Sequence, residues 1–320
     1  MVFRYSKKIT KLYILQSLPL GKLFLCPKMK TKNTMKTKLK IAIQKSGRLS
    51  ESSLKLLKEC GIDIDNGLNK LKAEASNFPI EVFFLRDDDI PQYVADGVAD
   101  IGIVGENVLL EKNKILKVVE KLGFGKCRLS LAIPKEQSYK SIKDLNGKRI
   151  ATTYSTILSK YLKSQKVKAE IHEISGSVEI APSIGLADAI CDLVSSGSTL
   201  FTNGLKEVEI ILKSEAVLVA NKKLEKEQQA ILDKLLFRMT AVRKAKNTKY
   251  ILLNAPNNKL EAICKILPGM KSPTILPLAN KGWSSVHSVV EENQFWEIIE
   301  KLKVEGAQGI LVVPIEKMIL

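Results

Sequence analysis

Strand-like and helix-like patterns alternate along most of this chain, and this alternation is the strongest constraint on its fold. A short buried strand is expected at residues 40–44, and a helix follows at about residues 50–60. Ser50 is a candidate N-cap for that helix, and Gly61 can end it in a left-handed conformation. Such alternation is typical of a parallel or mixed sheet that is covered by helices.

The chain contains more strand and helix units than one small sheet can hold. A helix is expected to open at Asp89 and Pro91, and others are expected at residues 155–164 and 224–244. Further strands are expected at residues 82–85, 100–104, 128–133, 149–153, 189–194 and 208–220. A length of 320 residues also exceeds the usual size of a single core. The sequence therefore predicts two α/β lobes with a cleft between them.

A third unit is predicted at the end of the chain, after a short polar linker at residues 244–248. Its strands and helices are expected in the order βαββαβ, at residues 249–255, 258–267, 274–278, 284–290, 294–302 and 309–313. This order is that of a ferredoxin-like domain. Small domains of this shape often bind regulators, although the fold alone is weak evidence for that role.

The net charge of +17 points to anionic small molecules rather than to nucleic acid. Residues 1–36 contain nine of the 51 Lys and Arg residues and no acid, so 42 basic and 34 acidic residues leave +8 on the rest. There the lysines are scattered among acids, without interleaved arginines and aromatic residues. Phosphorylated substrates are the expected anions, and no nucleic acid partner is expected. No membrane association is expected, since no apolar run reaches the roughly 18 residues that a membrane span needs.

The basic residues 1–36 form an N-terminal extension with a modest apolar stretch at residues 12–15. A transit peptide or a secretory signal is one interpretation of such a segment. Because Met35 stands just before the first predicted strand, we favour a translation start at Met35, or else a disordered tail.

Cysteine and histidine are too scattered to suggest a metal centre. The five cysteines are odd in number and never form a CxxC pair: Cys26, Cys60, Cys127, Cys191 and Cys264. This argues against a disulfide framework or a zinc site, and it favours a reducing, cytoplasmic compartment. The two histidines, His172 and His287, are more often structural than catalytic.

Residues 188–200 are the most informative segment of the chain. An apolar strand ends there in the small residues Ser-Ser-Gly-Ser-Thr at positions 195–199, and a helix follows. Backbone N–H groups of such a loop can converge on a phosphate, and the helix N-terminus adds positive potential. An ordinary turn with a helix cap is an equally good interpretation. Asp188 and Asp192 are candidates for contacting ribose hydroxyls or a magnesium ion.

This segment resembles the phosphoribosyl-pyrophosphate loop of the ATP phosphoribosyltransferases. The resemblance includes Gly176-Ser-Val-Glu179 and Gly185-Leu-Ala-Asp188 before the loop and Asn203-Gly-Leu-Lys-Glu-Val after it. Ser196 stands where such loops commonly carry Thr, a change that retains the hydroxyl. Further blocks match in order over residues 35–320: Gln44-Lys-Ser-Gly-Arg-Leu49, Leu85-Arg-Asp-Asp-Asp-Ile-Pro91, Asp100-Ile-Gly-Ile-Val-Gly-Glu-Asn107 and Cys127-Arg-Leu-Ser-Leu131.

Two C-terminal motifs resemble the long form of this family, which carries its own regulatory domain: Ser272-Pro-Thr-Ile-Leu-Pro277 and Pro314-Ile-Glu-Lys317. The resemblance implies catalytic lobes like those of periplasmic binding proteins. Lobe I would be residues 37–126, rejoined by about residues 213–245, and lobe II would be residues 127–212. The regulatory domain would be residues 246–320.

The resemblance also implies a reaction. N1 of ATP would attack C1 of phosphoribosyl pyrophosphate and release pyrophosphate, with Mg2+ as cofactor, in the first step of histidine biosynthesis. Such an enzyme needs no nucleophile of its own. It aligns the two substrates and stabilises the leaving group with basic side chains.

The resemblance and the strand ends together indicate the site residues. The catalytic candidates are Lys45 and Arg48, which would contact ATP phosphates or pyrophosphate, with a solvated turn as the alternative. The candidates for binding phosphoribosyl pyrophosphate are Asp188, Asp192, Ser195, Ser196, Gly197, Ser198 and Thr199, and the two acids are also the candidate magnesium ligands. The candidates for binding ATP are Arg48, Asp87, Asp100, Gly105, Arg128, Thr152 and Tyr154. A helix cap is an equal alternative for Asp87.

In the third domain the family's histidine site lies between subunits, and its pattern maps to Asn254, Met270, Thr274 and Gly309. Some relatives carry Asp at the position of Asn254, where it can pair with the amino group of histidine. An Asn offers only a neutral hydrogen bond, about half as strong as a charge-assisted one. We expect feedback inhibition by histidine, and homodimers that close into a homohexamer.

Two other functions fit parts of the sequence. Two-lobed α/β chains include periplasmic solute receptors, but a receptor needs an export signal and has no reason to carry the loop at residues 195–199. A phosphoribosyltransferase for another base is the second alternative. The two enzymes are distinguished by a measurement of which base supports the release of pyrophosphate.

Overall fold

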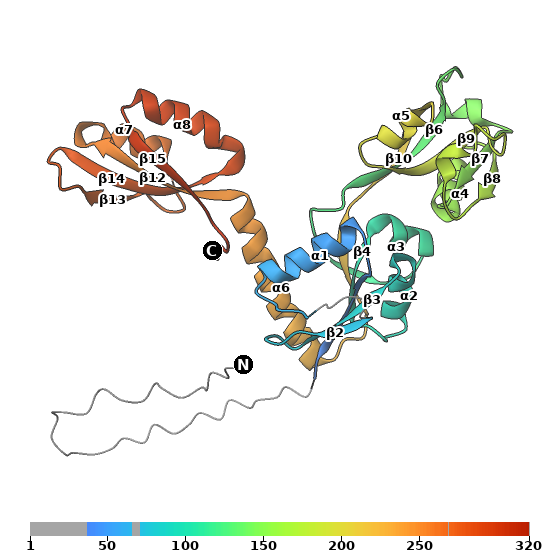
Figure 1. Ribbon diagram of the computed structural model, residues 1–320, viewed down its shortest axis with the longest axis horizontal. Helices are drawn as coiled ribbons and strands as arrows, with labels where there is room; N and C mark the ends of the chain where they lie inside the picture. Colours follow the sequence, from blue (N-terminus) through green and yellow to red (C-terminus); the bar gives the residue numbers. More distant parts are fainter. Residues whose placement is uncertain (1–36, 66–70, 268, 320) are drawn as a thin grey trace, which may run out of the picture. The chain divides into compact units, whose positions relative to one another are not determined.

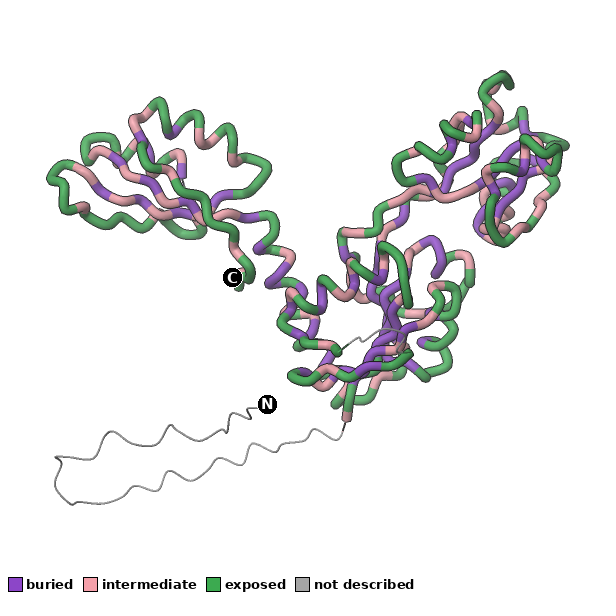
Figure 2. Tube along the Cα trace, in the orientation of Figure 1, coloured by how far each residue is buried: buried purple, intermediate pink, exposed green. Residues whose placement is uncertain are grey.

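The computed structural model describes residues 37–65, 71–267 and 269–319, which form three β-sheets with helices packed against them (Figure 1). The predicted N-terminal extension, residues 1–36, lies outside the described residues. No helix in these ranges is both long enough and apolar enough to cross a membrane. Buried residues concentrate along the strands of the three sheets (Figure 2).

The first sheet has six strands in the order β2-β3-β1-β4-β11-β5. Its strands are β1 (Leu39–Gln44), β2 (Lys72–Glu74), β3 (Ile80–Leu85), β4 (Ile101–Gly105), β5 (Lys117–Lys121) and β11 (Ala216–Ala220). β1 runs parallel to both β3 and β4, whereas β2, β5 and β11 pair antiparallel with their neighbours. Because parallel strands end at the same edge, the turns that follow β1, β3 and β4 share one edge of the sheet.

Helices cover both faces of the first sheet. α1 (Arg48–Glu59) and α6 (Lys226–Lys246) bury apolar side chains on one face. The short 3-10 helix η1 (Asp87–Asp89) leads into α2 (Ile90–Ala95), and α2 with α3 (Glu106–Lys112) covers the other face. Burial on both faces accounts for the nearly continuous apolar runs of the central strands.

The first helix begins earlier than the sequence predicts. α1 starts at Arg48 with Gly47 as its N-cap residue, so Ser50 lies inside the helix and does not cap it. Gly47 has φ +89°, a conformation that glycine adopts readily and that lets the chain turn directly into the helix. The predicted end of the helix is confirmed, since Gly61 follows with φ +69°.

The second sheet has five strands in the order β10-β6-β9-β7-β8. Its strands are β6 (Cys127–Pro134), β7 (Arg149–Thr152), β8 (Glu170–Glu173), β9 (Ala189–Val194) and β10 (Leu205–Ser214). β7 runs parallel to β8 and β9, whereas β6 is antiparallel to β9 and β10. The 3-10 helix η2 (Ile142–Leu145) and α4 (Ser155–Ser164) contribute to the core on one face, and η3 (Val178–Ile180) and α5 (Ser198–Thr202) to the core on the other.

The predicted bounds of α4 and β9 are confirmed, and strand structure is also confirmed at residues 208–220. Two strands occupy this segment, and Glu215 separates β10 of the second sheet from β11 of the first. The apolar pattern of the sequence continues from β10 into β11 because β10 packs in the core of the second sheet and β11 in that of the first. Three further strands, β2, β5 and β8, have no clear sequence signal because each lies at a sheet edge and is largely exposed.

The third sheet has four antiparallel strands in the order β13-β14-β12-β15. Its elements are β12 (Thr248–Pro256), η4 (Asn257–Lys259), α7 (Leu260–Ile266), β13 (Thr274–Pro277), β14 (Trp283–Glu291), η5 (Glu292–Gln294), α8 (Phe295–Val304) and β15 (Gln308–Pro314). This confirms the predicted ferredoxin-like order. The predicted linker at residues 244–248 is wrong, because α6 continues to Lys246 with Ala245 buried, and only Asn247 precedes β12.

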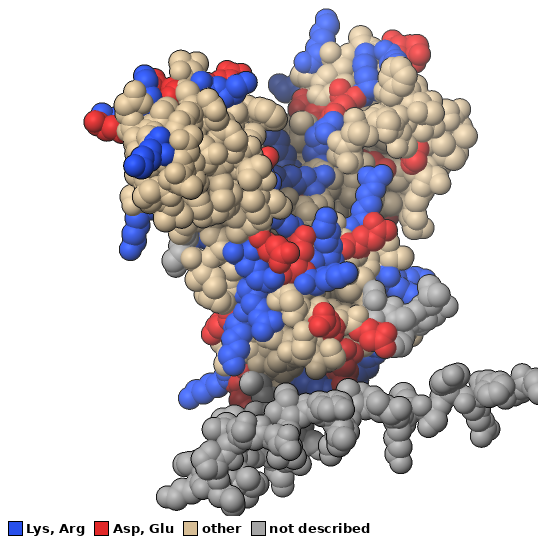
Figure 3. Space-filling view, turned by 60° about the vertical axis from the view of Figure 1, so that its left-hand side comes forward, with Lys and Arg blue, Asp and Glu red and all other residues tan. Residues whose placement is uncertain are grey.

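Charged side chains of both signs are interspersed on the face shown in Figure 3. Several lysines of the described residues form ion pairs, such as Lys246 with Glu59 at 2.6 Å and Lys249 with Glu292 at 2.9 Å. The scattered lysines of the sequence thus belong to a mixed, solvated surface.

Candidate functional site

Residues 195–199, called the loop below, comprise the turn at residues 195–197 between β9 and α5 and the first two residues of α5. β9 ends at Val194, and α5 begins at Ser198 with Gly197 as N-cap at φ +84°. This left-handed conformation favours glycine, so Gly197 sets the direction in which the chain enters the helix. Within the described part of the chain, the N–H groups of Ser196 and Gly197 have no backbone acceptor. The first N–H groups of a helix also lack intrahelical partners, so the loop presents several donors in one place.

Hydroxyl groups stabilise the same loop. The Ser196 and Ser198 hydroxyl oxygens lie 3.0 Å apart, and the Ser198 N–H approaches Ser196 Oγ at 3.4 Å. At the other end of α5, the Asn203 side chain donates to the Thr199 carbonyl at 2.9 Å. Ser196, Ser198 and Thr199 are all exposed, so an anion can reach their N–H and hydroxyl groups.

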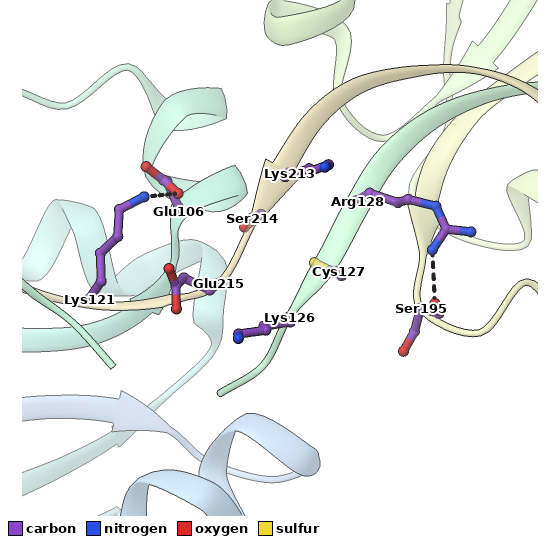
Figure 4. A pocket seen from close by; sticks show the side chains of 9 residues that line it. All are labelled: Glu106, Lys121, Lys126, Cys127, Arg128, Ser195, Lys213, Ser214 and Glu215. Atoms are coloured by element: carbon purple, nitrogen blue, oxygen red, sulfur yellow. Dashed lines mark hydrogen bonds and ion pairs between the residues drawn. The ribbon is translucent and has the colours of Figure 1, made fainter. Parts of the chain in front are cut away.

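A cavity of about 380 Å3 lies beside the loop where the chain crosses between the first and second sheets (Figure 4). Its lining consists of Glu106, Lys121, Lys126, Cys127, Arg128, Ser195, Lys213, Ser214 and Glu215. Lys121 lies 3.4 Å from Glu106, whereas Lys126 and Lys213 are exposed and have no ion-pair partner within residues 37–65, 71–267 and 269–319. The cavity therefore offers unpaired positive charge to an anionic ligand.

Arg128 connects this cavity to the loop. Its Nη1 donates to the Ser195 carbonyl at 3.1 Å, as Figure 4 shows. Its Nε and Nη2 donate to the two carboxylate oxygens of Glu207 at 2.5 and 2.6 Å. This guanidinium, a candidate for binding ATP, thus already has a carboxylate and a carbonyl as partners. Glu207 lies 79 residues away in the sequence, and no local pattern indicated its contact with Arg128.

The two candidate acids lie near opposite ends of β9. Asp188 precedes the strand and forms an ion pair with Arg149 at 3.1 Å, and it also accepts the Arg149 backbone N–H at 2.9 Å. These contacts hold the pKa of the Asp188 carboxyl below its ordinary value. Asp192 lies near the loop, and burial raises the pKa of its carboxyl.

The separation of these acids limits how the two candidates could serve a magnesium ion. Four residues of a strand span about 13 Å, too far for one ion to bridge Asp188 and Asp192. Within the described ranges, no group of three or more His, Cys, Asp or Glu residues is arranged to hold a metal ion. The described residues therefore do not fit a metal ion held by the protein alone, and Asp188 serves the pair with Arg149 instead.

Lys45, Arg48, Asp87 and Gly105 share the edge of the first sheet where β1, β3 and β4 end. The Lys45 N–H donates to the Leu85 carbonyl at 2.7 Å and so joins the turns after β1 and β3. Lys45 and Arg48 are exposed. Burial, followed by the charge of the neighbouring Asp88, raises the pKa of the half-buried Asp87.

Two arrangements at this edge could not be predicted. A Cβ at Gly105 would lie 2.4 Å from Asn107 Oδ1, so a larger residue where β4 meets α3 would have to displace the Asn107 side chain. Arg86 directly follows Leu85 and adds a third exposed cation to Lys45 and Arg48. The only sequence signal for Arg86 is its position at the end of a strand.

Asp100 is not brought to that edge. It precedes β4 and lies at the opposite end of the sheet, where its carboxylate accepts the Lys40 backbone N–H at 2.7 Å and the Gln228 side chain at 2.8 Å. Only 7% of Asp100 is exposed, and burial raises its pKa. The carboxylate joins β1, β4 and α6, which is a structural role and corrects the expectation that Asp100 lies with the ATP candidates.

Thr152 is the last residue of β7 and Tyr154 follows the strand, at the same edge of the second sheet as the loop. Thr152 is fully buried, and its hydroxyl donates to the Cys191 carbonyl at 2.7 Å and accepts the Tyr154 N–H at 2.9 Å. The Tyr154 hydroxyl accepts a hydrogen bond of 3.1 Å from the Asn107 side chain, and burial raises its pKa. Thr152 therefore stabilises the end of β7 against β9. Of the two residues, Tyr154 is the one that contacts α3, through Asn107.

The four candidates for binding histidine are only partly brought together. A Cβ at Gly309 would lie 3.2 Å from Asn254 Nδ2, so these two residues are direct neighbours across β12 and β15. Thr274 lies opposite His287, two strands away from Asn254. Met270 lines a separate cavity of about 380 Å3 beside the ends of α6 and β14. Next to Asn254, His287 makes hydrogen bonds with Tyr250 at 3.1 Å and Ser285 at 3.0 Å, a cluster that the sequence does not indicate.

The molecule combines two helix-covered sheets with an exposed loop rich in N–H donors and a cationic cavity. This combination defines a protein that binds phosphorylated ligands. Residues 86–241 match the ATP phosphoribosyltransferase family, HisG, and residues 245–317 match the HisG C-terminal domain. The ATP phosphoribosyltransferase of Cytophaga hutchinsonii is 62% identical over 285 residues, which cover 89% of this chain and the whole of that protein. The same enzyme of Bacteroides fragilis is 58% identical over 282 residues, covering 88% of this chain and all of the relative.

A solved structure agrees with these sequence matches. The ATP phosphoribosyl transferase (HisG:HisZ) complex from Thermotoga maritima is similar at a TM-score of 0.55 and 32% identity, over 63% of this chain and 98% of that chain. The chain therefore belongs to the ATP phosphoribosyltransferase family, in its long form with a C-terminal domain. It is a phosphoribosyltransferase that acts on ATP, an enzyme of histidine biosynthesis. This family membership replaces the alternative interpretation of the chain as a periplasmic solute receptor.

Proposed function

We propose that the enzyme joins N1 of the ATP adenine to C1 of the ribose in phosphoribosyl pyrophosphate. The bond between C1 and the pyrophosphate oxygen breaks as the bond between N1 and C1 forms, and pyrophosphate leaves with the electron pair. The products are N1-(5-phosphoribosyl)-ATP and pyrophosphate. The family assignment supports the class of reaction, and the loop at residues 195–199 beside the cationic cavity is the observation that carries the choice of donor.

The loop and the cavity suit two parts of the donor substrate. The unpaired N–H groups of Ser196 and Gly197 and the exposed hydroxyl of Ser198 suit a phosphate of phosphoribosyl pyrophosphate. Asp192 stands near the same loop and suits a ribose hydroxyl. Lys126 and Lys213 lack acid partners in the described segments and suit a polyphosphate in the cavity, where they would stabilise the charge that develops on the leaving group.

The edge of the first sheet suits the other substrate. Lys45, Arg48 and Arg86 are exposed there without an acid partner among the residues that the structure describes, and they suit the triphosphate of ATP. Tyr154, whose hydroxyl meets Asn107, and Asp87 are the remaining side chains proposed for the adenosine part. No protein nucleophile is required, so the catalytic contribution is alignment of N1 with C1 and stabilisation of pyrophosphate.

Magnesium is proposed as part of the substrate rather than as a resident ion. Mg2+ bound with phosphates usually keeps several waters and takes only one or two carboxylates from the protein. Asp188 is engaged with Arg149, which leaves Asp192 as the candidate carboxylate near the loop. The magnesium complex of phosphoribosyl pyrophosphate is therefore the proposed donor.

The test of this function is a measurement of pyrophosphate release with ATP, phosphoribosyl pyrophosphate and magnesium, each omitted in turn. Dependence on all three, with a product that contains both the ATP and the phosphoribosyl group, is the expected result. Release with another purine nucleotide or a free base but not with ATP would replace the proposed acceptor. No release by folded protein with any acceptor would contradict the proposed function.

We further propose that histidine inhibits the enzyme through the C-terminal domain, and that homodimers close into a homohexamer when it binds. The family assignment of residues 245–317 and the direct contact between Asn254 and Gly309 support this proposal. The coupling requires two assemblies with different affinities for histidine. Sedimentation analysis with and without histidine tests it, and an unchanged assembly together with full activity at millimolar histidine would contradict it.

A further inference from the structure

Arg128 and Glu207 form the most fully bonded ion pair near the proposed site. Both carboxylate oxygens of Glu207 accept from the guanidinium, at 2.5 Å from Nε and 2.6 Å from Nη2. The hydroxyl of the buried Ser130 also donates to Glu207 Oε1 at 2.6 Å. A bidentate pair that is held by a third donor fixes the plane and the rotation of the guanidinium.

The fixed guanidinium leaves Nη1 to donate to the Ser195 carbonyl at 3.1 Å. Arg128 lies opposite Val194, the last residue of β9, so its side chain reaches the first residue of the loop. In a trans peptide unit the C=O and N–H bonds point in opposite directions. Holding the Ser195 carbonyl toward Arg128 therefore directs the Ser196 N–H away from Arg128, to the other side of the peptide.

We propose that Glu207 and Arg128 are positioning residues that orient the Ser195–Ser196 peptide unit of the phosphate-binding loop. Arg128 acts on the loop through the Ser195 carbonyl, and Glu207 acts through Arg128. Neither side chain needs to touch a substrate for this role. The inference rests on the proposed function of the loop, and it gives Arg128 a role that differs from binding ATP.

Steady-state kinetics of Glu207→Gln test the role. Gln retains one acceptor oxygen but loses the charge and the second acceptor, so the guanidinium is free to rotate. The KM for phosphoribosyl pyrophosphate should rise about tenfold, the order expected when a hydrogen bond to a charged group is lost. The KM for ATP should stay within about twofold, since the triphosphate of ATP is proposed to bind at the edge of the first sheet, away from the loop. An equal rise for both substrates would overturn the inference.

Glu209→Gln is the matched control. Glu209 lies on the same strand, but its carboxylate accepts from the Tyr139 hydroxyl at 2.9 Å. This variant should leave both KM values unchanged. The double variant Glu207→Gln with Arg128→Gln should be no worse than Arg128→Gln alone, because residues that act as one unit are not additive. Additive losses would show that the two side chains act independently, and would overturn the inference.

Hydrogen exchange separates this inference from the proposed reaction. Amides of residues 195–199 should exchange faster in full-length Glu207→Gln than in the wild type, whereas amides of β12 in the third sheet should not change. Unchanged loop exchange would overturn the positioning role whatever the activity. If the wild type released no pyrophosphate, the proposed reaction would fail while the exchange result still decided the role of Glu207.

Discussion

The carboxylate of Glu111, on α3, accepts a hydrogen bond of 2.8 Å from the backbone N–H of Thr156 at the start of α4. Its other oxygen accepts the Ile157 N–H at 3.0 Å. Two orphan N–H groups of α4 are thus capped by an acid from a helix that packs on the first sheet. An acid at a helix N-terminus also interacts favourably with the helix dipole.

Glu111→Ala should therefore destabilise the enzyme by about 1 kcal/mol, the usual cost of losing a helix cap. Glu111→Gln should lose less, because its amide oxygen still accepts one N–H. Urea unfolding followed by circular dichroism measures both. Glu136→Ala, at an exposed acid that follows β6 of the second sheet, is the control and should have no effect. Equal stability of Glu111→Ala and wild type would contradict the capping role.

Asp188→Asn should lower stability slightly without changing the KM for phosphoribosyl pyrophosphate. The contact with Arg149 holds the pKa of Asp188 below its ordinary value. A lowered native pKa means that the contribution is complete above the ordinary pKa of about 4 and is lost as the pH falls through the native pKa. Thermal melts at neutral pH should separate the variant from the wild type, and melts at the acid end should converge. A large rise in KM would restore Asp188 to the binding site.

Asp192→Asn should instead affect binding of the donor. Burial raises the pKa of Asp192, so this carboxyl takes up a proton at a higher pH than an ordinary Asp does. If the carboxylate binds ribose hydroxyls as proposed, kcat/KM for phosphoribosyl pyrophosphate should fall on the acid side with that raised pKa. The variant should have a lower kcat/KM, and its pH profile should lack this fall on the acid side, the acid limb. Retention of the limb in Asp192→Asn would assign it to another group.

Removal of magnesium should abolish activity without unfolding the protein. EDTA should stop pyrophosphate release, and excess Mg2+ should restore it. Isothermal titration of Mg2+ into the protein alone should show no tight binding, whereas titration in the presence of phosphoribosyl pyrophosphate should. Tight binding of Mg2+ to the protein alone would reveal a resident site that Asp192 and its neighbours do not explain.

Gly309→Ala should weaken histidine inhibition and leave catalysis intact. Its Cβ would lie 3.2 Å from Asn254 Nδ2, and φ +56° disfavours any side chain there. Gly306→Ala is the control, because Gly306 has a similar φ of +85° but its Cβ would meet only Pro256, at 3.7 Å. Histidine titrations of pyrophosphate release measure the difference. Equal inhibition of both variants would place histidine away from Asn254.

The charge at position 254 makes a second prediction for the same domain. Asn254→Asp should strengthen inhibition, because a carboxylate makes a charge-assisted hydrogen bond to the amino group of histidine. The gain should shrink at high salt, because position 254 is partly exposed and salt screens such an ionic contact. Weaker inhibition of Asn254→Asp would mean that the Asn254 side chain stabilises the sheet rather than binding histidine.

Much of the local structure was determined by the sequence alone. Apolar runs with clear ends predicted β9 and α4 residue for residue, and the strand and helix order of residues 248–314 predicted the ferredoxin-like sheet. These signals depend on neighbours in the chain, such as the small residues that follow β9. The resemblance over residues 35–320 supplied the family, which the comparisons confirm.

Only the tertiary structure decided which polar groups meet. Asp188 and Asp100 look like site residues in the sequence, but each lies at the far end of its strand and bonds to Arg149 or Lys40. Glu207 and Glu111 gave no signal, because their partners are 79 and about 45 residues away. The physical reason is that the hydrophobic pattern of a strand determines which side chains face the core. The direction of the strand and its neighbours in the sheet determine which of its ends lies at the site.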